Sequence, residues 1–239
     1  MRTDGGGSSI DGPLPIYIRC KPNMLPGFEK TADYETCGDL KRMKKKVLGI
    51  YGSPRKRANT DTLLDSVLEG TRAAGAETHT VYIRDLEMSG CIECGGCDKT
   101  GKCVLQDGMQ AVYPLLEDAD IIFLASPNFF YGVTSQAKAL IDRCQAMWSK
   151  KMLKKEPERR KNYGSGKGYL IAVGATRGKN LFEGMKLTAK YFFDALDMSY
   201  EGGLCFRGIE KRSDLKKKPD IIQEAFEYGK KVIAENSDA

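Results

Sequence analysis

Residues 46–75, KVLGIYGSPRKRANTDTLLDSVLEGTRAAG, decide the fold of this chain. The stretch begins with a short apolar run, continues through a polar loop and ends in a helical pattern from residue 60 onward. The apolar residues of that pattern fall on one face, namely Leu63, Leu64, Val67 and Leu68. A buried strand, a loop and an amphipathic helix in this order predict a parallel sheet that is covered by helices.

The same alternation continues toward the C-terminus. We predict further strands at residues 78–86, 120–126, 168–174 and 199–206, and further helices at residues 109–119, 135–148, 181–196 and 219–236. Because crossovers between parallel strands are right-handed, five such strands favour an α/β fold with a doubly wound five-stranded parallel sheet in the order 2-1-3-4-5. Ligands of such sheets bind beyond the carboxyl ends of the strands, here between the first and third strands.

The composition agrees with one compact domain. The chain has 239 residues, of which 41% are hydrophobic and 29% charged, so its core can be stable without crosslinks. Residues 1–46 differ from the rest, with a glycine-rich and serine-rich start, four prolines and no helical periodicity. We therefore expect an irregular N-terminal arm at 1–46 and one domain at 47–239. No apolar run of roughly 18 to 20 residues and no signal-peptide pattern occur, so we expect a cytoplasmic protein without membrane contact.

The formal net charge of +6 is carried largely by basic runs at residues 41–46, 149–161 and 216–218. Such a balance suits anionic cofactors and phosphorylated substrates as well as nucleic acids. Aromatic residues are not interleaved with these runs, as they would be in a stacking platform for single strands. We interpret the runs as solvated surface and do not expect nucleic acid as a partner.

The loop GSPRKRANT at residues 52–60 is a candidate phosphate site. It connects a strand to a helix start, whose free backbone N–H groups attract anions. Ser53, Asn59 and Thr60 supply further donors, and Arg55 supplies a guanidinium. The loop matches neither GxxxxGK[ST] nor GxGxxG, which leaves a mononucleotide phosphate as the predicted ligand. The alternative is an ordinary capped helix start, which accounts for Asn59 and Thr60 alone.

Two more loops reach the same edge of the predicted sheet. SPNFFYG at residues 126–132 places three aromatic side chains after the third predicted strand, where a flat ring could lie against them. A hydrophobic lid over the core is the alternative interpretation of this loop. GATRGKN at residues 174–180 follows the fourth predicted strand.

Four of the eight cysteines lie within CIECGGCDKTGKC, as Cys91, Cys94, Cys97 and Cys103. Disulfides are rare in the reducing compartment that we expect for this chain. Structural zinc sites usually use two pairs of ligands a dozen or more residues apart, and the chain has one histidine. The dense spacing favours a [4Fe–4S] cluster held by a loop at residues 90–108, with zinc and unligated redox thiols as alternatives. This loop follows the second strand, which neighbours the first strand in the predicted order. It should therefore lie at the same edge of the sheet as the phosphate loop.

These motifs carry a family resemblance. GSPRxxxNT, SPxxxYG followed by QAKALIDR, and TRGxxLFEG resemble the flavodoxin-like NAD(P)H-dependent FMN reductases over residues 46–236, and the cysteine loop resembles the iron–sulfur flavoproteins of that superfamily. The resemblance implies a flavodoxin-like fold, FMN, a [4Fe–4S] cluster and a homodimer or homotetramer. It implies that the FMN phosphate is held by Ser53, Arg55, Asn59 and Thr60, and that the isoalloxazine ring is bordered by Pro127, Asn128, Phe129, Phe130, Tyr131, Gly132, Ala175, Thr176 and Arg177. Asn128 departs from the family pattern, which usually has an aliphatic residue there.

We therefore expect an iron–sulfur flavoprotein that passes electrons between FMN, its cluster and an external donor or acceptor, either a small redox protein or a small molecule. NAD(P)H is a candidate donor. The alternatives are an NAD(P)H-dependent FMN or quinone reductase without a cluster, and a redox-sensing nucleic-acid-binding module.

No residue is predicted to act as a catalytic acid or base, because the flavin would supply the chemistry. Beyond His79 the chain has no second histidine from which nucleophilic catalysis could be built. We expect His79 to be structural, and Cys144 and Cys205 to be buried as small apolar side chains. Cys20 and Cys37 receive no role.

Overall fold

The computed structural model describes residues 44–160 and 162–237. Its five strands are all parallel and form one sheet in the order β2-β1-β3-β4-β5, which confirms the predicted topology. The strands are β1 (Lys46–Tyr51), β2 (Glu77–Tyr82), β3 (Ile121–Pro127), β4 (Lys167–Gly174) and β5 (Ser199–Arg207). The predicted arm, with Cys20 and Cys37, lies outside the described residues except at its last three positions.

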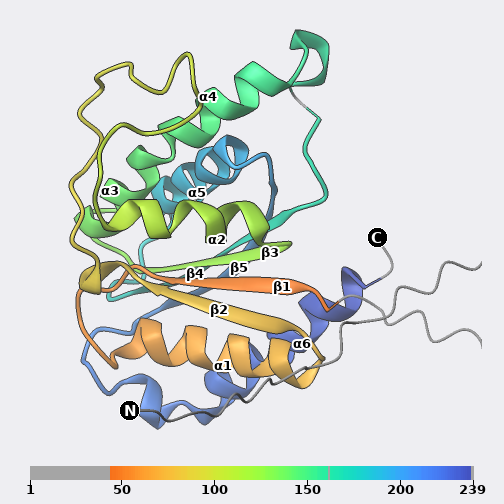
Figure 1. Ribbon diagram of the computed structural model, residues 1–239. Coiled ribbons are helices and arrows are strands. Elements are labelled where there is room, and N and C mark those ends of the chain that lie inside the picture. Colours follow the sequence, from red (N-terminus) through yellow and green to blue (C-terminus); the bar gives the residue numbers. More distant parts are fainter. Residues whose placement is uncertain (1–43, 161, 238–239) are drawn as a thin grey trace, which may run out of the picture. The chain divides into compact units, whose positions relative to one another are not determined.

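Helices cover both faces of the sheet (Figure 1). One face carries α1 (Asn59–Ala73) and α6 (Pro219–Glu235). The other carries α2 (Tyr113–Asp118), α3 (Ser135–Arg143), α4 (Gln145–Lys154) and α5 (Glu183–Ala195). Short 3-10 turns lie at η1 (Ile83–Asp85), η2 (Gly108–Ala111), η3 (Pro157–Arg159) and η4 (Leu215–Lys217). None of the described helices is long and apolar enough to cross a membrane.

The core consists of two layers, one on each side of the sheet. Along β3, Phe123 contributes to the layer under α1 and α6, while its neighbours Ile122 and Leu124 contribute to the layer under α3 and α5. Successive side chains of a strand point to opposite faces, so a strand buried on both faces needs a continuous apolar run. This requirement explains why the central strands read as uninterrupted apolar sequence.

Two glycines allow α1 and α6 to pack backbone against backbone. A methyl group at Gly70 would overlap the carbonyl oxygen of Phe226, and one at Gly229 would overlap the carbonyl oxygen of Val67. The contact is reciprocal, since each glycine meets the backbone of the opposite helix. A side chain at either position would therefore force the two helices apart.

Three predicted elements are wrong in detail. The helix predicted at residues 109–119 begins as the 3-10 turn η2 and is α-helical only from Tyr113 to Asp118. The helix predicted at residues 135–148 is broken at Cys144, whose ψ of 2° ends the hydrogen-bond ladder of α3 before α4 begins. The strand predicted at 78–86 ends at Tyr82 and continues as the 3-10 turn η1. Two arginines beside these breaks have buried side chains, Arg143 at the end of α3 and Arg84 in η1.

One lysine of the basic runs is not solvated. The ammonium group of Lys151 is buried, lies 3.1 Å from Oδ1 of Asp194, and sits over the rings of Trp148 and Tyr163. The interpretation of the run at residues 149–161 as solvated surface is thus wrong for Lys151, which fastens α4 to α5.

Candidate functional site

The loops that follow β1, β3, β4 and β5 converge on a cavity of about 170 Å³ at the carboxyl edge of the sheet. Eight of the predicted cofactor residues line it, namely Ser53, Arg55, Asn59, Thr60, Pro127, Asn128, Phe129 and Ala175. Five others do not, namely Phe130, Tyr131, Gly132, Thr176 and Arg177. Small-molecule sites usually enclose roughly 300–1,000 Å³, so this cavity suits the phosphate end of a nucleotide.

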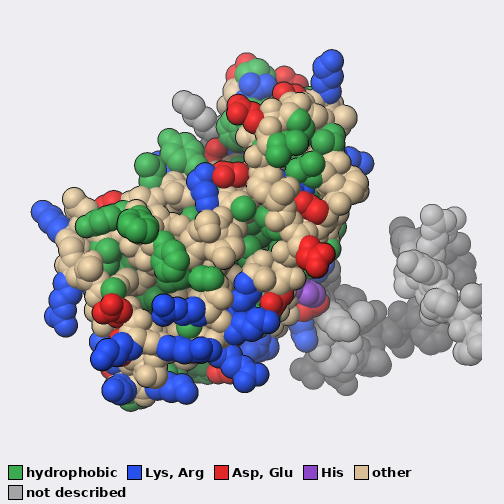
Figure 2. All heavy atoms as spheres, turned by 90° about the vertical axis from the view of Figure 1, so that its left-hand side faces the viewer, with side chains coloured by type: hydrophobic (Ala, Val, Ile, Leu, Met, Phe, Trp, Pro, Cys, Tyr) green, Lys and Arg blue, Asp and Glu red, His purple; other side chains and the backbone are tan. Residues whose placement is uncertain are grey.

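Sequence reasoning missed the contribution of the loop after β5. Ile209, Glu210 and Arg212 also line the cavity, and Nη2 of Arg212 donates to the carbonyl oxygen of Lys56 at 2.6 Å. Figure 2 looks onto this edge of the sheet, where Lys and Arg side chains gather on the side of α1 and α6. The surroundings of the cavity are therefore positively charged and favour an anionic ligand.

The β1–α1 loop (residues 52–58) presents the start of α1 to this cavity. Ala58 is the N-cap residue, and its carbonyl oxygen accepts from the Thr62 N–H at 3.0 Å. The first N–H groups of the helix have no acceptor in a preceding turn, and such groups bind anions. The hydroxyl of Ser53 accepts from the Arg55 N–H at 3.2 Å and shapes the loop, while the Arg55 side chain remains exposed at the cavity.

Arg84 holds the β1–α1 loop from below. Its Nη1 donates to the carbonyl oxygen of Ser53 at 3.1 Å, and its Nη2 lies 3.0 Å from Oδ2 of Asp61. Asp61 also accepts from the Arg57 N–H at 2.9 Å. Burial raises the pKa of the Asp61 carboxyl, against the lowering effect of the bonds from Arg57 and Arg84. No motif singled out this pair, because a strand through residue 86 would not have turned Arg84 inward.

The side chain of Asn59 is committed to the loop after β5. Its Nδ2 donates to the carbonyl oxygen of Lys211 at 2.8 Å, and its Oδ1 accepts from the Leu215 N–H at 3.3 Å. Asn59 thereby positions the loop that carries Arg212, and its own contact with a phosphate stays a prediction. These bonds join residues 152 and 156 positions apart, so no local pattern could reveal them.

The aromatic loop forms a tight turn at residues 129–132. Phe129 and Gly132 exchange two backbone hydrogen bonds of 2.9 Å, and Phe130 and Tyr131 between them have φ values of 50° and 63°. Non-glycine residues rarely adopt this left-handed conformation, and such strain is concentrated at functional sites. Phe130 is fully exposed, and Phe129 and Tyr131 are about half exposed. The turn thus holds aromatic surface out of the core, which contradicts a lid over the core.

The hydrogen bonds of Asn128 account for an amide at a position where the family pattern usually has an aliphatic residue. Nδ2 of Asn128 donates to the carbonyl oxygen of Leu181 at 2.6 Å, and its Oδ1 accepts from the Tyr131 N–H at 3.2 Å. The amide therefore fastens the aromatic turn to the start of α5, which an aliphatic side chain could not do.

The four cysteines of the cysteine loop (residues 90–108) line a second cavity of about 560 Å³. Cys91 and Cys94 are exposed, while Cys97 and Cys103 are partly buried. The donor set and the shared cavity fit a thiolate-bound metal group. However, no three His, Cys, Asp or Glu side chains among the described residues are arranged to hold a metal ion. The outer part of the loop would therefore have to close around such a group.

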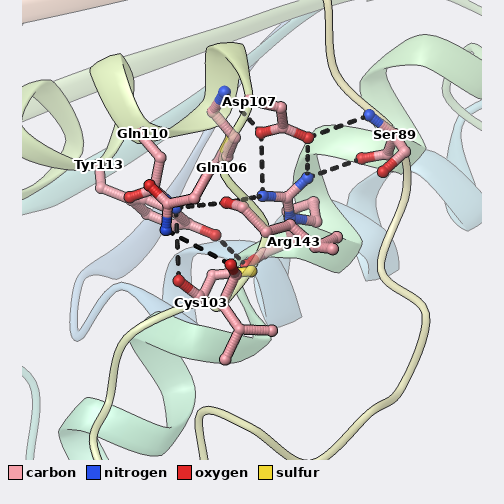
Figure 3. Close-up of polar contacts among 10 residues, drawn as sticks. Ser89, Cys103, Gln106, Asp107, Gln110, Tyr113 and Arg143 are labelled. Atoms are coloured by element: carbon pink, nitrogen blue, oxygen red, sulfur yellow. Dashed lines mark hydrogen bonds and ion pairs between the residues drawn. The ribbon is translucent and has the colours of Figure 1, made fainter.

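Arg143 connects the two ends of the cysteine loop (Figure 3). Its Nη1 donates to the carbonyl oxygen of Ser89 at 3.0 Å and to Oδ2 of Asp107 at 2.6 Å, and its Nη2 donates to Oδ1 of Asp107 at 3.0 Å. Burial raises the pKa of the Cys103 thiol, but the hydrogen bonds from Leu105, Tyr113 and Arg143 and the guanidinium charge together outweigh it, so the net pKa is lowered. The sequence held one signal for this residue: Arg143 lies three positions after Leu140, on the buried face of α3.

The two cavities lie at opposite ends of α3. The Thr134 hydroxyl, at the start of this helix, donates to the carbonyl oxygen of Gly52 at 2.6 Å, whereas Arg143 at its end lines the cysteine cavity. A helix of nine residues spans about 13 Å. The two cavities are thus separated by one short helix, and the cysteine loop is fastened at Ser89 and Asp107 to the Arg143 end of that helix.

The remaining predicted residues have ordinary surroundings. His79 is half exposed on β2 and lies 3.1 Å from a Glu77 carboxylate oxygen. Cys144 is fully buried, and burial raises the pKa of its thiol. Cys205 is only partly buried, which corrects the expectation of a fully buried side chain.

Comparison with known proteins gives concordant results. A family model described as NADPH-dependent FMN reductase matches residues 45–197. An iron–sulfur flavoprotein of Archaeoglobus fulgidus is 40% identical over 98 residues, which cover 41% of this chain and 44% of that protein. Another, of Methanosarcina thermophila, is 34% identical over 134 residues, or 55% of this chain and 64% of that protein. The chain thus matches between about two fifths and two thirds of the length of these relatives.

Solved structures support the fold. A flavone reductase superposes with a TM-score of 0.60 at 16% identity. The match covers 81% of this chain and 63% of the flavone reductase chain. An NAD(P)H:quinone oxidoreductase from Methanothermobacter marburgensis superposes with a TM-score of 0.57 at 12% identity and covers 79% of this chain and 96% of its own. The doubly wound sheet, the loops at its carboxyl edge and the match over most of the described domain show that the chain belongs to the NADPH-dependent FMN reductase family.

Proposed function

We propose that this protein is a flavin-dependent oxidoreductase that binds FMN at the carboxyl edge of the sheet and holds a [4Fe–4S] cluster with Cys91, Cys94, Cys97 and Cys103. The observation that carries the proposal is that all four cysteines line one cavity, which α3 connects to the nucleotide cavity. The similarity to iron–sulfur flavoproteins over 98 and 134 residues supports the same combination.

The FMN phosphate would lie at the start of α1. Ser53, Arg55 and Thr60 line the cavity there, together with Arg212 from the loop after β5. The positive surroundings favour a dianionic phosphate over a neutral ligand. The isoalloxazine ring would then lie outward, along Pro127–Gly132 and the loop at Ala175, Thr176 and Arg177.

When bound, FMN can exchange two electrons with a donor such as NAD(P)H and single electrons with an iron–sulfur cluster. The residues of this chain bind and orient the two groups, and none needs to transfer a proton. The external partner would be a small redox protein or a small molecule. The homodimer or homotetramer implied by the resemblance remains a prediction, which sedimentation of the purified protein would test.

The deciding experiment is anaerobic purification followed by analysis of flavin, iron, zinc and acid-labile sulfide. We expect one FMN per chain and about four irons and four sulfides. Cys97→Ser should lose the iron while retaining FMN, and the matched variant Cys205→Ser on β5 should retain both. Iron-free protein that contains zinc would contradict the cluster, and protein that binds no FMN would contradict the flavin site.

A second function has its own support. The cysteine side chains do not converge on a metal position within the described residues, and an NAD(P)H dehydrogenase (quinone) of Deinococcus radiodurans is 35% identical over 81 residues, or 34% of this chain and 40% of that protein. The protein would then be an FMN or quinone reductase without a cluster. Cys91→Ser separates the two: NAD(P)H-driven quinone reduction that is unchanged, in protein that never contained iron, would favour this second function.

A further inference from the structure

The cysteine loop begins and ends at one buried ion pair. Ser89 precedes the first cysteine by two positions and Asp107 follows the last by four. Both contact the guanidinium of Arg143, whose side chain is 0% exposed. Asp107 also accepts from the Ser89 N–H at 3.2 Å and from the Met109 N–H at 3.1 Å. Arg143 and Asp107 thus close the segment that bears all four cysteines into a ring.

A second set of contacts fixes the end of the loop near Cys103. Nε2 of Gln110 donates to the carbonyl oxygens of Leu105 at 2.6 Å and Cys103 at 3.4 Å, and the Tyr113 hydroxyl donates to the carbonyl oxygen of Arg143 at 2.9 Å (Figure 3). The backbone at Cys103 is therefore held by side-chain hydrogen bonds, while Cys91 and Cys94 are exposed. The end of the loop that these hydrogen bonds hold is the one next to the guanidinium.

One N–H donor of Arg143 has no hydrogen-bond partner within the described residues. This donor is the buried Nε, and Arg143 lines the cysteine cavity. A buried N–H of this kind is costly unless a ligand or water satisfies it. Arg84 has a buried Nε of the same kind, so what distinguishes Arg143 is its place in the lining of the cysteine cavity, together with Cys103.

We infer that Arg143 is the positioning residue of the cysteine site, closing the loop through Asp107 and placing a fixed positive charge beside Cys103. The inference deepens the proposed function and rests on it for the effect of the charge on a bound cluster. Hydrogen bonds and charges near the sulfurs set the reduction potential of such clusters, and a positive charge favours the reduced form.

The chain contains a matched control. Arg84 is similarly buried, pairs with Asp61, donates to the carbonyl oxygen of Ser53, and has a buried Nε without a partner among the described residues. Arg84 holds the β1–α1 loop, whereas Arg143 holds the cysteine loop. Arg→Lys at each position keeps the charge and removes the two-pronged contact with aspartate.

Amide hydrogen exchange on the full chain, prepared free of iron, tests the closure of the loop. In Arg143→Lys the amides of Ser89, Gly108 and Met109 should exchange about tenfold faster than in the parent, while those of β3 stay unchanged. Arg84→Lys should instead accelerate exchange at Arg57 and leave the first three amides as they were. Equal protection of Ser89, Gly108 and Met109 in Arg143→Lys and the parent would overturn the inference, whether or not the protein binds iron.

The reduction potential of the anaerobically purified protein tests the charge. Arg143→Gln and Asp107→Asn break the same ion pair, so loosening of the loop alone would shift the potential in the same direction in both. A charge effect shifts them in opposite directions: Arg143→Gln should lower the potential by about 59 mV, a tenfold change in the one-electron equilibrium, and Asp107→Asn should raise it. Shifts of the same sign, or none, would overturn the electrostatic role. Protein without iron would refute the proposed cluster, and amide exchange would then decide on Arg143.

Discussion

The hydroxyl of Thr134 donates to the carbonyl oxygen of Gly52 at 2.6 Å and accepts from the Ala137 N–H at 3.2 Å. Thr134 is fully buried and is the N-cap residue of α3. One side chain thus joins the end of β1 to the helix that separates the two cavities. The relationship makes the geometry of the nucleotide cavity depend on the correct start of α3.

We expect Thr134→Val to lower the free energy of unfolding by about 2 kcal/mol, because it removes an N-cap and leaves a buried carbonyl oxygen without its donor. Denaturant unfolding of the flavin-free protein measures the change. Thr188→Val is the matched control, since the Thr188 hydroxyl donates only to the carbonyl oxygen of Gly184 within α5. The control should stay within about 0.5 kcal/mol of the parent. Equal effects in the two variants would contradict the special role of Thr134.

The sheet could be predicted from sequence because it depends on local patterns. The apolar runs of β1, β3 and β4 and the amphipathic helices between them predict the elements, and right-handed crossovers predict the strand order. The cavity at the carboxyl edge follows from the topology, and so do eight of its lining residues. The positions of the four cysteines around one cavity follow from their spacing.

The interior charges could not be predicted in the same way. Arg84 turns inward in a 3-10 turn where the local pattern predicts a continuing strand. Arg143 lies on the buried face of α3, but its acidic partner cannot be identified from the local sequence. Their partners are 23 and 36 residues away. The loop after β5 contributes through Asn59, whose partners are more distant still. Contacts of this kind depend on the assembled fold.

Arg55 tests the position of the phosphate without depending on the cluster. A guanidinium that pairs with a phosphate contributes roughly 1.5–3 kcal/mol. We therefore expect Arg55→Ala to weaken FMN binding by about ten- to a hundredfold, while riboflavin, which lacks the phosphate, binds parent and variant alike. Fluorescence titration measures both. Arg72→Ala, on the last turn of α1, is the control and should leave FMN affinity unchanged. Equal weakening of riboflavin and FMN would show that this loop does not hold the phosphate.

Phe130 tests whether the aromatic turn is kept for binding. Its φ of 50° is strained for a phenylalanine, and its fully exposed ring makes little packing contact. Phe130→Gly relieves the backbone strain, which stabilises the folded state, but it also increases the conformational entropy of the unfolded chain. Because the two effects oppose each other, the free energy of unfolding should change by no more than about 1 kcal/mol. FMN or riboflavin affinity should fall nonetheless, because the ring loses an aromatic neighbour. A variant that loses stability but binds flavin normally would indicate that the turn serves the fold alone.

Asp107 gives the closure of the cysteine loop a pH dependence. The hydrogen bond from Arg143 lowers the pKa of this carboxyl, burial opposes the effect, and the Met109 and Ser89 N–H groups add to it. A carboxyl whose pKa is lower in the folded state stabilises the protein above its unfolded pKa, which is about 3.9, and that stabilisation is lost as the pH falls through the folded value. We therefore expect the parent to exceed Asp107→Asn in free energy of unfolding by a constant amount from about pH 7 to 5, and the difference to shrink toward zero below about pH 4.

Several other carboxyls also titrate in this range, including Asp85, Glu201 and Asp214. They are present in both proteins, so the difference isolates Asp107. Denaturant unfolding of the iron-free proteins at a series of pH values measures it, and a difference that stays constant or grows on acidification would show that the charge of Asp107 does not close the loop.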